Sequence, residues 1–277
     1  RSRGLGDVYK RQRTNSVSEY YFSRKLREID EMNRLGEKVI SLGIGSPDMA
    51  PAYEVIHTLI HGAENPENHA YQSYKGIPEL RRAFAEWYQK YYGVELDPEK
   101  EIQPLAGSKE GILLLSLAFL DKGDKVLVPN PGYPTYSSAS LLTEAEIIPF
   151  DLKEENNWMP DFEALEAMDL TGVKMMWVNY PNMPTGARAT EALYRRLVEF
   201  GLKHKILICN DNPYSFILNE EHLSILSVSR AKECCIELNS LSKAHNMAGW
   251  RIGMIAGEAE VIANVLKVKS NMDSGMF

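Results

Sequence analysis

The chain has 277 residues, of which 44% are hydrophobic and 25% are charged, and its formal net charge is −7 at pH 7. This length and composition suit a globular protein with a sizeable core, and the acidic balance argues against a general nucleic-acid or membrane surface. The longest apolar run, residues 111–120, is interrupted by Ser116 and falls short of the roughly 18 residues that span a bilayer.

The chain opens with a basic stretch, residues 1–12, that shows neither an apolar period nor a helix cap. In an acidic chain this predicts a non-native leader, and no secretory signal is visible in it. Residues 20–36 show an amphipathic pattern that predicts a helix ending at Gly36. The apolar run Val39–Leu42 predicts a short strand, which leads into the turn-rich loop 43–48.

A helix expected over residues 52–63 carries His57 and His61, four positions apart. This spacing can place two metal ligands on one face of a helix. However, no glutamate follows the first histidine and no third ligand is evident, so a solvated helix face is the stronger interpretation and we expect no metal.

From Pro78 onwards, helix-like and strand-like runs alternate. Pro78 suits the first turn of a helix that Gly93 ends. Strand-like runs lie near 125–129, 146–150, 173–179, 205–210, 234–241 and 251–256, and helix-like runs at 109–120, 135–142, 161–168 and 189–203. The alternation predicts an α/β fold, a three-layer sandwich with a mainly parallel sheet. Ligands of such sheets bind at the carboxyl ends of the strands.

The three cysteines, Cys209, Cys234 and Cys235, lie in strand-like apolar runs. Buried thiols in a reducing compartment are the simplest interpretation, so we expect a cytoplasmic protein.

Two loops in the first half of the sheet carry side chains of chemical interest. Gly107 allows a tight turn before a helix that begins at Ser108 and Lys109, where free N–H groups favour an anion. Tyr133 lies in a loop stiffened by two prolines and could stack on a flat heteroaromatic ring. Taken alone, the first motif favours an ordinary helix cap and the second an ordinary packed tyrosine.

Two further loops follow the strand-like runs 173–179 and 205–210. The first contains Asn182 in an Asn-x-Pro-Thr-Gly sequence, and the second contains Asp211 and Tyr214. A carboxylate at a strand end can pair with a protonated ring nitrogen, and a phenol can bond a ring hydroxyl. Each loop taken alone favours plain turn chemistry.

The last motif is Lys243, just after the run 234–241. Ser240 and Ser242 precede it and Arg251 follows eight positions later, with small residues and glycines between. A lone lysine is usually a solvated surface group. Together with the other loops, however, it completes the parts that hold pyridoxal phosphate as a Schiff base.

In order, the motifs are Gly-Ser-Lys, Tyr, Asn-x-Pro-Thr-Gly, Asp-x-x-Tyr and Ser-x-Ser-Lys, then an arginine. This order resembles the fold-type-I, pyridoxal-phosphate-dependent aminotransferases of class I/II, over residues 20–277. Within that family, the loop 42–48 and the segment 269–275 are similar to the branch of LL-diaminopimelate and alanine-type aminotransferases.

The resemblance implies a role for each residue of the site. It implies that Lys243 carries the cofactor and moves a proton, that Asp211 keeps the pyridine nitrogen protonated, and that Tyr214 bonds the ring oxygen O3′. It further implies that Tyr133 stacks on the ring, that Ser108, Lys109, Ser240, Ser242 and Arg251 hold the phosphate, that Tyr71 reaches the phosphate of a partner subunit, that Gly45 lies near the substrate carboxylate, and that Asn182 stands close to the position of a ring-binding asparagine.

One position departs from the family pattern. The family usually has an asparagine directly before Pro-Thr-Gly, where this chain has Met183. Methionine cannot donate a hydrogen bond, so the O3′ contact falls to Asn182 or to Tyr214 alone.

The resemblance also implies the activity and the organisation of the chain. It implies transamination of an L-amino acid with a 2-oxo acid in a homodimer, with no nucleic-acid or membrane partner. Residues 13–50 are expected to form an N-terminal arm and part of a small domain, and residues 51–277 the large domain that binds the cofactor. The rest of the small domain is expected to be missing, as in a C-terminally truncated chain. Two alternatives remain on the same scaffold: a carbon–sulfur β-lyase and a non-catalytic regulatory domain.

Overall fold

The computed structural model describes residues 12–277, so the predicted leader at residues 1–12 lies outside the described residues except for its last position. In the described part, seven strands form one sheet in the order β1-β7-β6-β5-β4-β2-β3. They are β1 (Ile102–Leu105), β2 (Lys125–Asn130), β3 (Glu146–Asp151), β4 (Val173–Asn179), β5 (Leu207–Asp211), β6 (Cys235–Ser240) and β7 (Gly253–Gly257). Among them, β7 alone runs opposite in direction to the other six, so the predicted mainly parallel sheet is confirmed.

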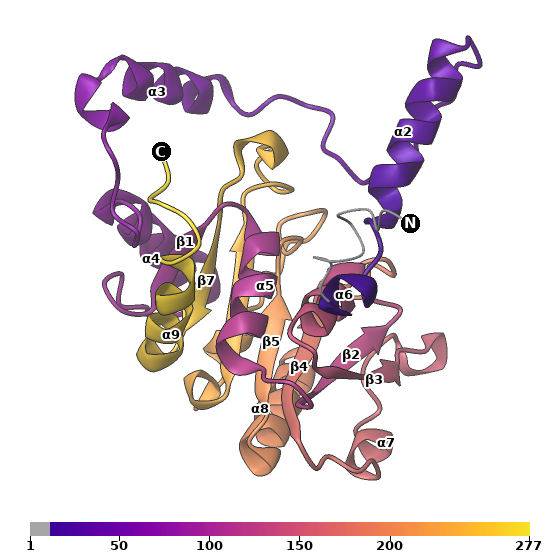
Figure 1. The fold of residues 1–277 in the computed structure, drawn as a ribbon. Helices are drawn as coiled ribbons and strands as arrows, with labels where there is room; N and C mark the ends of the chain where they lie inside the picture. The colour runs from indigo at the N-terminus through magenta and orange to yellow at the C-terminus, as the bar shows by residue number, and fades with distance from the viewer. Residues whose placement is uncertain (1–11) are drawn as a thin grey trace, which may run out of the picture.

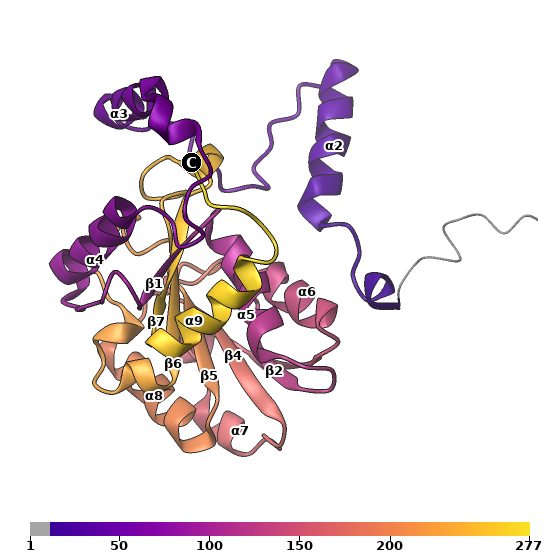
Figure 2. The same cartoon turned by 60° about the vertical axis from the view of Figure 1, so that its left-hand side comes forward.

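Helices cover both faces of the sheet (Figures 1 and 2). The α-helices are α2 (Tyr21–Arg34), α3 (Tyr53–Glu64), α4 (Pro78–Tyr92), α5 (Ser108–Phe119), α6 (Pro134–Leu142), α7 (Phe162–Glu166), α8 (Glu191–His204) and α9 (Ala259–Lys269). Residues of α5, α6 and α9 join one buried cluster, and residues of α4, α7 and α8 join the other. The chain therefore folds into the three-layer α/β sandwich that its alternating pattern predicts.

The central strands are apolar on both faces because both faces are covered. In β4, Met175 and Trp177 belong to the cluster on the α5 side, and Met176 and Val178 belong to the cluster on the α8 side. Successive side chains of a strand point to opposite faces, so a doubly covered strand reads as a continuous apolar run.

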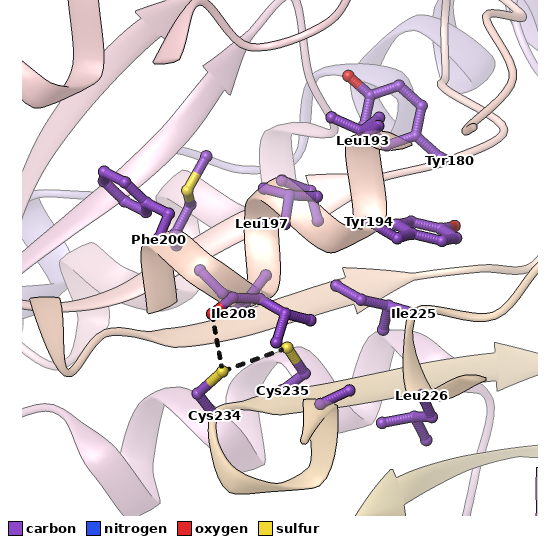
Figure 3. Packing of buried hydrophobic residues seen from close by; sticks show 14 of the residues in the cluster. Tyr180, Leu193, Tyr194, Leu197, Phe200, Ile208, Ile225, Leu226, Cys234 and Cys235 are labelled. Atoms are coloured by element: carbon purple, nitrogen blue, oxygen red, sulfur yellow. Dashed lines mark hydrogen bonds between the residues drawn. The ribbon is translucent and has the colours of Figure 1, made fainter. Parts of the chain in front are cut away.

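Helix α8 shows how one helix face is fitted to the sheet. Leu193, Leu197 and Phe200 follow the spacing of one helix face. In Figure 3, Leu197 and Phe200 lie near Ile208 of β5, and Leu193 lies further along the helix beside Tyr180. The Thr190 hydroxyl caps this helix by accepting a hydrogen bond from the Leu193 N–H at 3.1 Å.

The segment before α4 is arranged differently. Helices α2 and α3 stand away from the sandwich in both views, and neither contains a buried residue (Figures 1 and 2). The predicted strand at Val39–Leu42 is wrong, because these residues pair with no other strand in the described chain. Ile40 and Leu42 are 84% and 91% exposed, so an apolar run has formed no strand where no sheet edge lies beside it.

No helix within residues 12–277 combines the length and the apolar character that a membrane crossing requires. His57 and His61 lie on α3 with their ring centroids 4.4 Å apart. No group of three or more metal-binding side chains is found in the described residues.

Candidate active site

A pocket of about 720 Å³ opens at the carboxyl edge of the parallel strands. Strands β4, β5 and β6 each end beside it, and β7 begins beside it because it runs the other way. The predicted site residues that line it are Gly45, Ser108, Lys109, Tyr133, Asn182, Asp211, Tyr214, Ser240, Ser242, Lys243 and Arg251. Tyr71 alone is not brought to this pocket and is 93% exposed.

Lys243 lies in the loop that follows β6 and is half-buried. Its Nζ donates a hydrogen bond to the Gly45 carbonyl oxygen at 2.6 Å. Burial, reinforced by the positive charge of Arg251, lowers the pKa of the Lys243 amine. A lowered pKa makes the neutral, nucleophilic form of the amine more accessible.

Asp211 ends β5 and is 5% exposed. Its Oδ2 accepts a hydrogen bond from the Tyr136 hydroxyl at 2.9 Å, whereas its buried Oδ1 has no partner among the described residues. Burial raises the pKa of Asp211 to about 6, although the Tyr136 hydrogen bond opposes the rise. This oxygen can therefore accept a hydrogen bond from a donor on a bound group.

Tyr136 is positioned by its contact with the sheet. Its ring stacks on Trp177 of β4 with centroids 4.8 Å apart and an interplanar angle of 5°. The ring is fully buried, which leaves its hydroxyl one orientation toward Asp211. The sequence assigned no role to Tyr136, although it lies in the first turn of α6, three residues after Tyr133.

The helix α5 begins beside the pocket and offers an anion site at its N-terminus. Gly107 precedes it with φ +81°, and a Cβ at this position would lie 2.1 Å from Nη2 of Arg251. A Cβ on Gly253 would lie 2.7 Å from the backbone nitrogen of Ser108. Both glycines are required for Arg251 and β7 to approach the free N–H groups of the helix.

Hydroxyls complete the same corner of the pocket. The Ser240 Oγ donates to the Ser242 Oγ at 2.9 Å, and both serines are buried. The Arg251 guanidinium donates to the carbonyl oxygens of Ala248 at 2.9 Å and Ala106 at 3.2 Å. These bonds hold a charged fork and two hydroxyls around one small volume, a combination that suits a phosphate.

Aromatic side chains also line the pocket. The Nζ of Lys109 lies 4.1 Å from the ring centroid of Tyr20 and 5.9 Å from that of Tyr133. Burial and the nearby Asp211 raise the pKa of Tyr214 to about 12, so its phenol keeps its proton at neutral pH. Tyr20 comes from the N-terminal arm and was not predicted, because nothing in its local sequence points to the pocket.

The loop after β4 is held by asparagines. Asn179 donates from Nδ2 to the Asp211 carbonyl oxygen at 2.6 Å and accepts from the Met183 N–H at 2.7 Å. Asn182 donates to the Asn179 carbonyl oxygen at 3.3 Å and accepts from the Thr185 hydroxyl at 2.8 Å. Both ends of the Asn182 amide are thus engaged inside the loop, while Met183 also lines the pocket.

Arg188 is a further lining residue that the sequence did not indicate. It is exposed, and its Nη2 donates to the Leu218 carbonyl oxygen at 2.5 Å. Within residues 12–277 it forms no ion pair with an acidic side chain. The pocket lining therefore carries Lys109, Arg188, Lys243 and Arg251 against Asp211 as its acidic group.

Comparison with known proteins identifies the family. The sequence profile of the family described as aminotransferase class I and II matches residues 37–274. This chain is a class I and II aminotransferase. The enzyme catalyses pyridoxal-phosphate-dependent transamination, so the predicted family, activity and cofactor are confirmed.

Individual relatives agree with this membership. An LL-diaminopimelate aminotransferase of Dehalococcoides mccartyi is 44% identical over 267 residues, which cover 96% of this chain and 69% of that protein. A substrate-bound BacF structure from Bacillus subtilis superposes with a TM-score of 0.91 at 35% identity, covering 97% of this chain and 68% of that one. A Thermus thermophilus aspartate aminotransferase with maleate gives a TM-score of 0.89 at 28% identity, with coverages of 95% and 68%.

The residues of the aminotransferase pocket fit pyridoxal phosphate on three counts. The unpartnered Oδ1 of Asp211 matches a protonated ring nitrogen. The cradle of Arg251 and the start of α5, which a Cβ at Gly107 would fill, matches a phosphate. Lys243 supplies an amine with a lowered pKa in the same pocket.

Proposed function

We propose that the enzyme takes the amino group from LL-diaminopimelate and passes it to a 2-oxo acid. The observation that carries this proposal is the 44% identity to an LL-diaminopimelate aminotransferase across 96% of the chain. The cationic lining of the pocket supports it, because a donor with two carboxylates suits Lys109 and Arg188 in addition to the cofactor-binding cations.

In this proposal Lys243 holds the cofactor and Asp211 pairs with its ring nitrogen. Tyr214 faces the ring oxygen and Tyr133 stacks on the ring. The cofactor, when bound, supplies an electron sink for the charge left on the substrate Cα after its proton departs. The pKa of the Lys243 amine is lowered, which supports a role for its Nζ as the group that accepts this proton and later returns it.

The phosphate falls to Arg251, the two serines before Lys243, and the backbone N–H groups of Ser108 and Lys109. Because the Asn182 amide is engaged inside its loop, Tyr214 becomes the main partner for the ring oxygen. Gly45 stays assigned to the neighbourhood of the substrate carboxylate, which agrees with its contact with Lys243.

We propose a homodimer in which Tyr71 of one subunit reaches the phosphate bound by the other. The near-complete exposure of Tyr71 and its distance from its own pocket lining support an action in trans. Cytoplasmic residence is part of this proposal. So are an N-terminal arm with part of a small domain at residues 13–50 and a cofactor-binding large domain within residues 51–277.

The test is a panel of amino donors with 2-oxoglutarate as acceptor. LL-diaminopimelate, L-lysine and L-alanine form a matched series, since L-lysine is LL-diaminopimelate without its distal carboxyl group. We expect the highest kcat/KM with LL-diaminopimelate, with the loss for L-lysine appearing mainly in KM. A clear preference for L-alanine would contradict the proposed donor and leave the aminotransferase activity intact.

A further inference from the structure

A second buried acid lies across the sheet from the pocket. Glu237 of β6 has no exposed surface. Its Oε1 accepts hydrogen bonds from the Tyr88 and Ser224 hydroxyls, each at 2.8 Å. Its Oε2 accepts from the Asn210 Nδ2 at 2.9 Å and from the Ile225 N–H at 3.1 Å. Tyr88 belongs to α4 and Asn210 to β5, whereas Ser224 and Ile225 lie in the segment between β5 and β6.

The hydrogen bonds that Glu237 accepts favour its charged form. The amide groups of Asn210 and Ile225 are obligate donors. The Ser224 hydroxyl oxygen accepts from the Leu226 N–H at 3.1 Å, and the Tyr88 hydroxyl oxygen accepts from the Asn239 Nδ2 at 3.3 Å. These contacts leave the proton of each hydroxyl available to Glu237. Burial raises the pKa of Glu237 and the four hydrogen bonds oppose that rise, so the bonds favour its ionised form.

This buried charge has no cationic partner in the described part of the chain, because none of the ion pairs found there includes Glu237. The titratable groups that interact with it are Tyr88 and Tyr92 of α4, Tyr194 of α8, Asp211 of β5 and Cys235 of its own strand. Each of these is neutral or anionic. A buried anion without a counter-ion is a poor source of stability, so its presence beside a functional site calls for another role.

The sheet places this anion next to Asp211. Asn210 pairs with Glu237 in the β5–β6 register, and Asp211 is the next residue of β5. Alternation along the strand turns Asn210 toward Glu237 and Asp211 toward the pocket. We propose that Glu237 is a positioning residue that reinforces, through its negative charge, the preference of Asp211 for a protonated ring nitrogen.

The proposal rests on the proposed pairing of Asp211 with the cofactor ring. Burial is the largest cause of the raised pKa of Asp211, and the charge of Glu237 adds to it. The same charge attracts a cation in the pocket, so Glu237 adds to the attraction that Asp211 exerts on a positively charged ring. The hydrogen bond from Asn210 to Glu237 also restrains the backbone next to Asp211.

The first test measures Asp211 in the apoprotein, where the cofactor plays no part. The chain is labelled with [γ-¹³C]aspartate, and the Asp211 signal is assigned with Asp211→Asn and titrated in wild type and Glu237→Gln. We expect the apparent pKa of Asp211 to fall by roughly half a unit in Glu237→Gln. The glutamine fits because the two hydroxyls at Oε1 can accept from its amide. An unchanged titration in a folded variant would overturn the proposal.

The second test compares affinities for pyridoxal phosphate and for its 1-deaza analogue, in which a C–H group replaces the ring nitrogen. We expect Glu237→Gln to weaken pyridoxal phosphate about threefold relative to the analogue. An equal loss for both ligands would mean a structural role only. Ser224→Ala is the matched control, since it removes one hydrogen bond and keeps the charge, and we expect it to preserve the ratio. The same ratio change in Ser224→Ala would also overturn the proposal.

Asp211→Asn distinguishes a failure of the Glu237 role from a failure of the ring pairing. Loss of the preference for pyridoxal phosphate in Asp211→Asn but not in Glu237→Gln refutes only the role of Glu237. No loss in Asp211→Asn refutes the ring pairing itself. If Glu237→Gln does not fold, [δ-¹³C]glutamate labelling of the wild type decides, with Ser224→Ala for assignment. We expect Glu237 to be ionised at pH 8, and a protonated Glu237 there would overturn the proposal.

Discussion

At the scale of single residues, the burial that suits Asp211 to its proposed role also lowers the stability of the apoprotein. Its pKa in the folded chain is about 6 against an ordinary value of 3.8, mainly because it is buried. A carboxyl group with a raised folded pKa binds protons more tightly in the folded state than in the unfolded state. Its ionisation therefore destabilises the apoprotein, fully above about pH 6 and not at all below about pH 4.

Asp211→Asn is thus expected to stabilise the apoprotein at pH 7.5, by up to about 3 kcal/mol, and to weaken cofactor binding. Urea unfolding from pH 4 to pH 8 measures the first effect. The gain should shrink toward zero as the pH falls through the interval from about 6 to 4. If the free energy of unfolding rose by the same amount at every pH, the stabilisation would not come from removal of the charge.

Arg188 provides a prediction about the donor. We expect Arg188→Met to reduce the preference for LL-diaminopimelate over L-lysine by roughly tenfold, because a charged hydrogen bond to the distal carboxylate is lost. Steady-state kcat/KM for both donors measures it. Arg195→Met is the control, since Arg195 lies on α8, pairs with Glu191 at 3.4 Å and does not line the pocket. An equal loss for the two donors would exclude a role in distal recognition.

At the scale of elements, the start of α5 depends on a residue without a side chain. Gly107 and Gly123 both have positive φ, +81° and +87°, but an added Cβ meets Arg251 only at Gly107. We expect both alanine variants to lose about 1–2 kcal/mol of stability from backbone strain. Only Gly107→Ala should also weaken pyridoxal phosphate relative to pyridoxal, which lacks the phosphate. Equal ligand affinities in both variants would contradict the assigned anion site.

The elements that the sequence predicts best are those whose pattern is set locally. Strand β4 and helix α8 carry long apolar patterns and were expected within a few residues of their observed bounds. Strand β1 was not expected, because it is a four-residue edge strand that contains Pro104. Val39–Leu42 carries a strand-like pattern but has no sheet edge beside it.

The candidate site divides in the same way. Lys243 and Asp211 were found because each lies in a short motif at a strand end. Tyr136 and Glu237 were not, since their roles come from contacts across the fold: Tyr136 with Asp211, 75 residues away, and Glu237 with Tyr88, 149 residues away. In the sequence, Glu237 is a single acidic residue within an apolar run. No neighbouring motif indicates that its carboxyl group is buried.

At the scale of the whole molecule, the segment between α2 and α4 leaves apolar side chains uncovered. Leu42 and Tyr71 are 91% and 93% exposed, and α2 and α3 bury none of their residues. In the proposed homodimer a second copy covers this segment. Sedimentation velocity should show a dimer at micromolar concentration, and a monomer would contradict the proposal.

Mixing two inactive variants tests whether Tyr71 acts across the dimer. Tyr71→Ala keeps Lys243, and Lys243→Ala keeps Tyr71, so a mixed dimer contains one site with both residues only if Tyr71 serves the partner. After co-refolding we expect activity from about one quarter of the sites. No recovery, with dimers present, would place Tyr71 in its own subunit or outside the site.

The central claim is that Lys243 is the amine that holds the cofactor in this pocket. Borohydride reduction of the protein loaded with pyridoxal phosphate, followed by peptide mass mapping, tests it most directly. We expect one reduced adduct, on Lys243, and none on the pocket neighbour Lys109; in Lys243→Ala the adduct should vanish and turnover should fall by roughly 10²–10⁴-fold. An adduct on Lys109, or one spread over surface lysines such as Lys122, would contradict the account.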